Sequence, residues 1–260
     1  MHHDRSVNHD GFLLCGHGSR DPVSVDGFAE IATGLAPLLA GRPFAHGFME
    51  LAEPDLDTAV GRLVAAGAKR ILALPGFLFA ARHMQEDLPR ELAAAARHHG
   101  VEVVLGRELG ADARLVEALD DRIQSSVMPG AGIGLVVVGA GSSNAGTNAG
   151  LVTLAQELRH KHGFAVAVAC YASVARPTVA QAIEAMLGQG HRRILLLPWF
   201  LTEGSLLGLA RRQASAAAGD RAVLIEAAAL GAHPLVLATL ADRAEELARS
   251  VALPSGGTSA

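Results

Sequence analysis

The chain repeats itself with a period of 123 residues, and this repeat limits the folds that the sequence can adopt. Residues 71–79 (ILALPGFLF) align with residues 194–202 (ILLLPWFLT), and six of the nine pairs are identical. The same shift places Gly18 on Gly141 and Pro54 on Pro177. A copy of about 120 residues has the size of an ordinary domain. We therefore expect two similar domains.

Each half alternates short apolar segments with longer segments that are typical of helices. The expected strands cover residues 12–15, 44–50, 70–75 and 101–105 in the first half, and 133–138, 165–170, 194–197 and 223–227 in the second. Strands that alternate with helices predict parallel sheets with helices on both faces. The predicted fold class is therefore α/β: two Rossmann-like domains, each with a four-stranded parallel sheet, related by internal duplication.

The repeat also predicts where the domains begin and end. We expect a flexible tail over residues 1–10, a first domain over 11–126, a linker over 127–132, a second domain over 133–253, and a second tail over 254–260. In the first domain, Asp21 has the character of a helix N-cap, because Pro22 suits the first helical position. A second helix is expected to begin at Glu53–Pro54. A loop over residues 76–83 is expected to lead into an alanine-rich helix.

Composition excludes several classes of protein. The formal net charge is −4, which does not favour a nucleic-acid partner. No apolar run reaches the roughly 18 residues of a membrane span, and the amino terminus lacks a signal-peptide region, so a cytoplasmic protein without membrane association is expected. Cys15 and Cys170 lie in apolar segments outside any Cys-x-x-Cys pair and are expected to be buried.

Three polar residues of the first half have inert counterparts in the second. His17 aligns with Ala140, Glu50 with Ser173, and His83 with Leu206. All three are expected just beyond the carboxyl ends of strands, where open parallel sheets bind ligands. Two imidazoles and one carboxylate suit a divalent first-row metal, and only three protein ligands leave positions open for exchange. The sequence therefore predicts one metal site, in the first half only.

Three motifs in order resemble those of the sirohydrochlorin chelatases, the type II tetrapyrrole chelatases, in their long two-domain form. They are GHGSRD at residues 16–21, ELAEP at 50–54 and LPGFLFAARHMQEDLP at 74–89. The resemblance implies two chelatase-like domains, of which the second is degenerate. It also implies insertion of Co²⁺ or Fe²⁺ into sirohydrochlorin without ATP, for cobalamin or siroheme synthesis, and no cofactor beyond the substrate metal ion.

The resemblance assigns roles to the same residues. His17 and His83 match the two active-site histidines and are expected to hold the metal and to accept pyrrole protons. Glu50 matches a glutamate near the metal, where it would raise histidine basicity or complete the coordination. Arg20 and Arg82 are candidates for binding the substrate carboxylates, with Ser19 beside them, although both arginines could be solvated loop residues.

The position of the substrate is a further expectation. Since pockets favour domain interfaces, the tetrapyrrole is expected in a cleft between the two domains. Apolar walls could come from three aromatic residues, which could equally be core residues: Phe77, Phe79 and Trp199. A monomer is expected, because two fused domains supply what shorter family members build by dimerising.

Two other functions remain open on sequence grounds. A metal-delivery protein would use the same three residues without catalysis, and a chelatase for Ni²⁺ would need no different ligands. A structural module with a decayed site is disfavoured, because His17, Glu50 and His83 are all present.

Overall fold

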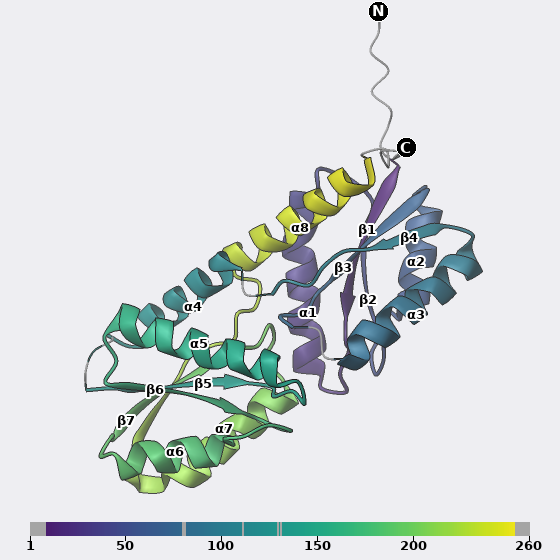
Figure 1. Ribbon diagram of the computed structural model, residues 1–260. Coiled ribbons are helices and arrows are strands. Elements are labelled where there is room, and N and C mark those ends of the chain that lie inside the picture. Colours follow the sequence, from purple (N-terminus) through teal and green to yellow (C-terminus); the bar gives the residue numbers. More distant parts are fainter. Residues whose placement is uncertain (1–8, 80–81, 111, 129, 131, 253–260) are drawn as a thin grey trace, which may run out of the picture. The chain divides into compact units, whose positions relative to one another are not determined.

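Two four-stranded parallel sheets form the framework of the protein (Figure 1). The computed structural model describes residues 9–79, 82–110, 112–128, 130 and 132–252, and the side chains of residues 82–85 also lie outside the description. The strand order is β2-β1-β3-β4 in the first sheet and β6-β5-β7-β8 in the second. The predicted fold class, a duplicated α/β structure, is therefore confirmed.

The two repeats place equivalent elements in the same order. The first contains β1 (Asp10–Gly16), α1 (Pro22–Leu35), the 3-10 turn η1 (Ala36–Leu39), β2 (Phe44–Phe48), α2 (Leu56–Ala65), β3 (Arg70–Pro75), α3 (Arg82–His99), β4 (Glu102–Leu105) and α4 (Ala113–Ser126). The second contains β5 (Gly134–Gly139), α5 (Ala145–His162), β6 (Val166–Tyr171), α6 (Val179–Gly188), β7 (Arg193–Pro198), α7 (Ser205–Ala218), the 3-10 turn η2 (Gly219–Arg221), β8 (Val223–Glu226) and α8 (Pro234–Ala252).

Several boundaries follow from local chemistry that the sequence displays. The backbone N–H of Val23 donates to the Asp21 carboxylate over 3.1 Å, so Asp21 caps α1 and Pro22 opens it, as predicted. Strand β3 occupies residues 70–75 as expected, because it is an apolar segment buried on both faces.

Other boundaries differ from the sequence-based expectation. Strand β2 ends at Phe48, two residues early, because Phe48 bridges to Asp55 and the backbone bends at residues 49 and 50. Helix α2 begins at Leu56, since Asp55 is its N-cap and accepts from the N–H of Thr58 over 2.7 Å. Helix α3 begins at Arg82, so the backbone of His83 belongs to a helix and not to the preceding loop.

Each sheet packs one face on a pair of helices through its own apolar cluster. In the first sheet, β1 and β3 contribute Leu13, Cys15 and Ile71, which pack with buried residues of α2 and α3. In the second sheet, β5 packs with α6 and α7 in the same way. Helices α2 and α3 therefore cover the same face of the first sheet (Figure 1).

The packing divides the chain differently from the repeat. Among the residues that the structure describes, one compact unit takes in those between 9 and 20, between 31 and 109 and between 237 and 252, and the other takes in those between 21 and 30 and between 110 and 236. Most of α8, from the second repeat, thus packs within the unit of the first sheet, while α4 belongs to the unit of the second sheet. The duplication describes the sequence, whereas each core is completed by residues of both repeats.

Both cysteines are free, buried thiols, as predicted. Burial raises the pKa of Cys170 to about 12 and also raises that of Cys15. The thiolate, which is the reactive form, is therefore strongly disfavoured at both positions. Among the described residues, no helix is long and apolar enough to cross a membrane.

Candidate functional site

The loops that follow β1 and β2 are joined by backbone hydrogen bonds. The two strands run parallel with Gly16 opposite Phe48. Beyond them, the N–H of Met49 donates to the carbonyl of Gly16 over 3.0 Å, and the N–H of Glu50 donates to the carbonyl of His17 over 3.1 Å. This continuation of the ladder brings His17 and Glu50 together, although 33 residues separate them in the chain.

The side chains of His17 and Glu50 form an exposed pair. Nδ1 of the imidazole lies 3.5 Å from Oε1 of the carboxylate. The exposed fractions are 42% for the histidine side chain and 57% for the glutamate side chain. An exposed pair of this kind contributes only about 0–1 kcal/mol to stability. Both groups can reach solvent and a ligand.

Gly18 allows the close approach of the two loops. Its φ angle is +93°, and a Cβ atom at this position would overlap the carbonyl oxygen of Glu50. Only glycine adopts such a backbone conformation at low cost. Gly18 is therefore required in the motif because any larger residue would displace the backbone of Glu50.

The third predicted ligand follows the neighbouring strand. His83 lies in the first turn of α3, after β3 and the loop that succeeds it. Since β1 lies between β2 and β3 in the sheet, the three predicted residues follow three adjacent strands. The side chains of His83 and Arg82 lie outside the described residues, so the structure brings together His17 and Glu50 of the predicted set.

The remaining predicted residues have mixed environments. Arg20 is exposed and Ser19 is partly buried, both next to His17 in the chain. Trp199 is only 5% exposed, which favours a core role for this side chain. Phe77 also packs against the apolar cluster of its own sheet, while Phe79 is partly exposed.

Glu91 of α3 is a site neighbour that sequence reasoning missed. Burial raises the pKa of its carboxyl group, and the nearby charges of Asp87 and Glu50 add to that effect, while Arg90 opposes it. Glu91 follows His83 by eight residues, which is slightly more than two helical turns. The sequence offers only this spacing within one helix as a signal, because Glu91 lies outside the three motifs.

The second repeat keeps the loop geometry and lacks the side chains. The N–H of Ser173 donates to the carbonyl of Ala140 over 3.0 Å, which reproduces the bond between Glu50 and His17. Gly141 has a φ angle of +91°, and a Cβ atom there would overlap the carbonyl oxygen of Ser173. The scaffold of a second site is thus present without its imidazole and carboxylate.

The fold is a duplicated α/β structure, and its histidine–carboxylate pair lies beyond the carboxyl ends of two adjacent parallel strands. Open parallel sheets bind their ligands at this end. The chain belongs to the CbiX family, whose family model matches residues 11–126 and again residues 134–247. The two matches coincide with the two halves of the internal repeat.

Similar proteins span most of the chain. A sirohydrochlorin ferrochelatase of Priestia megaterium is 29% identical over 188 residues, which are 72% of this chain and 71% of that protein. A sirohydrochlorin cobaltochelatase of the same organism is 27% identical over 241 residues, covering 90% of this chain and 78% of the relative. The structure of SirB from Bacillus subtilis with Fe³⁺ matches with a TM-score of 0.80 and 23% identity, covering 94% of this chain and 97% of SirB. This last likeness establishes the fold.

Proposed function

We propose that this protein inserts a divalent metal, Co²⁺ or Fe²⁺, into sirohydrochlorin without ATP. The observation that carries the proposal is the exposed pair of His17 and Glu50, held at the carboxyl ends of β1 and β2 within a CbiX repeat. Similar proteins include both a ferrochelatase and a cobaltochelatase. The ligand chemistry suits both metals, because imidazole and carboxylate bind Co²⁺ and Fe²⁺ alike.

The chemistry required of the site is metal binding and proton removal. Two pyrrole protons leave the macrocycle as two metal–nitrogen bonds form. A neutral imidazole can hold the incoming metal or accept one of these protons. We assign both roles to His17 and His83. Glu50 faces Nδ1 of His17 at 3.5 Å, so its negative charge stabilises the imidazolium that forms when His17 takes up a proton.

The proposal extends to the substrate and its setting. Sirohydrochlorin is rich in carboxylates, for which arginine is an efficient partner. Arg20, Arg82 and Ser19 flank the two histidines in sequence and are assigned to the carboxylates. We further propose a cytoplasmic enzyme that acts as a monomer and needs no cofactor beyond its substrate metal.

The test is metal insertion into sirohydrochlorin, followed by the change in its visible spectrum at limiting Co²⁺ or Fe²⁺. His17→Ala, His83→Ala and Glu50→Gln should each lower kcat/KM by about tenfold or more, since each removes a ligand or a charge that supports proton transfer. Ser173→Ala changes the residue equivalent to Glu50 in the second repeat and is the matched control. Its rate should stay within about twofold of the parent.

Two outcomes would contradict the proposal. Full insertion rates in His17→Ala or His83→Ala would remove the assigned roles. Cobalt binding by the parent protein without acceleration above the spontaneous rate would instead identify a metal-delivery protein, which uses the same residues without catalysis.

A further inference from the structure

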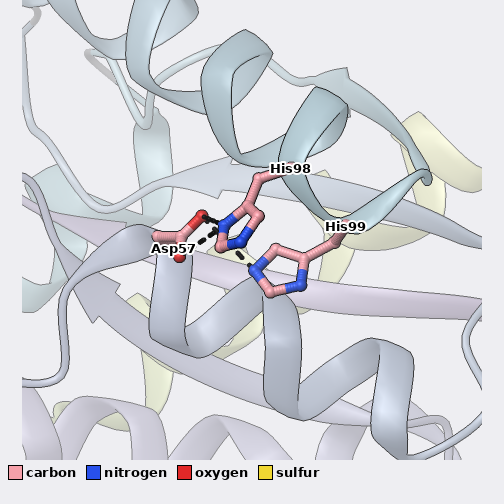
Figure 2. A group of neighbouring side chains, drawn as sticks. All are labelled: Asp57, His98 and His99. Atoms are coloured by element: carbon pink, nitrogen blue, oxygen red, sulfur yellow. Dashed lines mark hydrogen bonds and ion pairs between the residues drawn. The ribbon is translucent and has the colours of Figure 1, made fainter.

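A second group of side chains, on helices α2 and α3, has the composition of a metal site. Asp57 lies in the first turn of α2, and His98 and His99 are the last two residues of α3. One potential ligand atom from each residue lies within 4.8 Å of the other two. Figure 2 shows the carboxylate facing both imidazole rings. The group shares no residue with the site of His17 and Glu50.

The distances within this group are close to those around a bound cation. Nδ1 of His98 lies 2.9 Å from Oδ1 and 3.0 Å from Oδ2 of Asp57. Nε2 of His99 lies 3.3 Å from Oδ1 of the same carboxylate. A tetrahedral metal with bonds of about 2.1 Å holds neighbouring ligand atoms about 3.4 Å apart. A cation could therefore lie between Asp57 and His99 with little change in either residue.

His99 has a buried ring nitrogen whose bonding is incomplete. Its Nε2 atom is buried, and its neighbour among the described residues is Oδ1 of Asp57 at 3.3 Å, a contact that lacks good hydrogen-bond geometry. A buried polar atom without a well-formed hydrogen bond normally calls for an explanation, and an unplaced ion is one of the usual ones. His98 is 68% exposed in its side chain, so its ring can turn toward a cation between the other two residues.

Gly61 makes room for the His99 ring. It lies one turn after Asp57 on the same helix, and a Cβ atom there would stand only 2.8 Å from Cε1 of His99. Glycine in a helix interior costs roughly 0.5–1 kcal/mol relative to alanine. The helix thus carries a destabilising residue at a position where a Cβ atom would press against the imidazole ring of His99.

The second repeat joins its corresponding helices by different chemistry. The 123-residue shift places Gly61 on Glu184 of α6, and Glu184 pairs with Arg221, which follows α7, over 3.1 Å. Asp57 aligns with Ala180. The second repeat therefore has an ion pair at this joint, and the first repeat has two imidazoles and a carboxylate.

We propose that Asp57, His98 and His99 form a second cation site, which binds a late first-row divalent metal such as Co²⁺, Ni²⁺ or Zn²⁺ and ties α2 to α3. Two imidazoles and one carboxylate favour these metals over Mg²⁺ and Ca²⁺, which prefer oxygen ligands. Water completes the coordination, since His98 and Asp57 lie at the surface. The site does not depend on the chelatase function.

Cobalt binding to the whole 260-residue chain tests the proposal, by equilibrium dialysis and by the visible absorption of bound Co²⁺. The parent for this experiment carries His17→Ala and Glu50→Gln, which remove the strand-end pair. It also carries His2→Gln, His3→Gln and His9→Gln, which remove the histidines of the amino-terminal segment. This parent should bind one Co²⁺ per chain. Adding Asp57→Asn should weaken binding by about tenfold or more.

Two further variants make the result specific. Gly61→Ala keeps all three ligands but displaces the His99 ring, so it should also weaken cobalt binding by about tenfold. His160→Gln removes an exposed histidine near the end of α5 and is the matched control, with binding unchanged. Circular dichroism identifies variants that remain folded. An unchanged affinity in folded Asp57→Asn, or no binding by the parent at millimolar Co²⁺, would overturn the proposal. Because the strand-end pair is absent throughout, either result leaves the chelatase proposal untouched.

Discussion

At the scale of single residues, Gly18 links the backbone to the chemistry of the site. Its positive φ angle lets the loop after β1 lie directly on the carbonyl of Glu50. Gly141 lies on the carbonyl of Ser173 in the same way, in a repeat where Ala140 and Ser173 replace the imidazole and the carboxylate. The two glycines therefore support a loop geometry common to both repeats, whereas the imidazole and the carboxylate belong to the site of the first repeat alone.

This distinction predicts different outcomes for one substitution made in two places. Gly18→Ala and Gly141→Ala should each lower the free energy of unfolding by at least ~2 kcal/mol, because each adds an overlapping Cβ to a strained backbone. Only Gly18→Ala should also reduce metal insertion, since it displaces Glu50 from His17. Chemical denaturation and the insertion assay measure the two effects. Equal loss of activity per folded protein in both variants would contradict this assignment.

The sequence predicted the pairing of His17 with Glu50 and could not predict the group around Asp57. The first pair follows two strands that the repeat identifies, and parallel strands bring their ends together. Asp57 and His98 are separated by 41 residues and lie on two helices. Their contact depends on how α2 and α3 pack, and no motif or fixed spacing encodes that packing.

At the scale of elements, β2 carries a histidine in a setting that disfavours its charge. Burial lowers the pKa of His46, and the positive charge of Arg62 on α2 lowers it further. The His46 ring also packs edge-on against Phe48, with centroids 5.9 Å apart. Folding therefore favours the neutral imidazole, which fits a strand that is partly buried on the helix-covered sheet.

The direction of this pKa shift predicts how stability changes with pH. A histidine whose pKa is lowered by folding costs nothing above its unfolded pKa of about 6.5 and destabilises the protein as the pH falls below that value. His46→Gln removes this dependence. The melting temperature of the variant minus that of the parent should therefore become more positive as the pH is lowered from 7.5 to 5.5. A difference that stays constant over this range would show that His46 is not responsible.

Elements with a strong local signal were predicted better than those set by tertiary contacts. Residues 70–75 were predicted as a buried apolar strand, and they form one in the structure. The end of β2 and the start of α2 were displaced, because Phe48 pairs in an isolated bridge with Asp55 across the intervening loop. That bridge depends on a contact between residues seven apart, and strand periodicity does not reveal it.

At the scale of the whole molecule, each compact unit needs residues from both repeats. Within the first unit, α8 is held by ion pairs of Arg42 with Glu245 and of Arg107 with Glu246, the second at 2.9 Å. Leu240 of α8 is almost completely buried. The sequence could not predict this exchange of helices, because α4 and α8 are equivalent in the repeat and either would fit the pattern expected of each domain.

The exchange predicts that the two repeats do not fold well apart. A fragment of residues 1–128 lacks the α8 residues that complete its unit, and a fragment of residues 129–260 lacks α4 and residues 21–30. Separately, each should show exposed apolar surface and self-association. Expressed together, they should form a one-to-one complex with a single cooperative unfolding transition. Size-exclusion chromatography and circular dichroism measure both results, and a stable monomeric fragment of residues 1–128 would contradict the expectation.

The duplication also predicts that a second strand-end site can be restored. Ser173 and Ala140 keep the backbone bond that joins Glu50 to His17, and Leu206 occupies the second position of α7 just as His83 occupies that of α3. The triple variant Ala140→His, Ser173→Glu, Leu206→His should therefore bind one more Co²⁺ per chain than the parent, measured by equilibrium dialysis.

The triple variant will be less stable, because Leu206 packs against the apolar cluster of the second sheet. The double variant Ala140→His, Ser173→Glu keeps Leu206 and separates this cost from the gain of a site. It should bind the extra Co²⁺ more weakly than the triple variant, since it supplies one imidazole fewer. A folded triple variant with the cobalt stoichiometry of the parent would show that the second repeat has lost more than its three ligands.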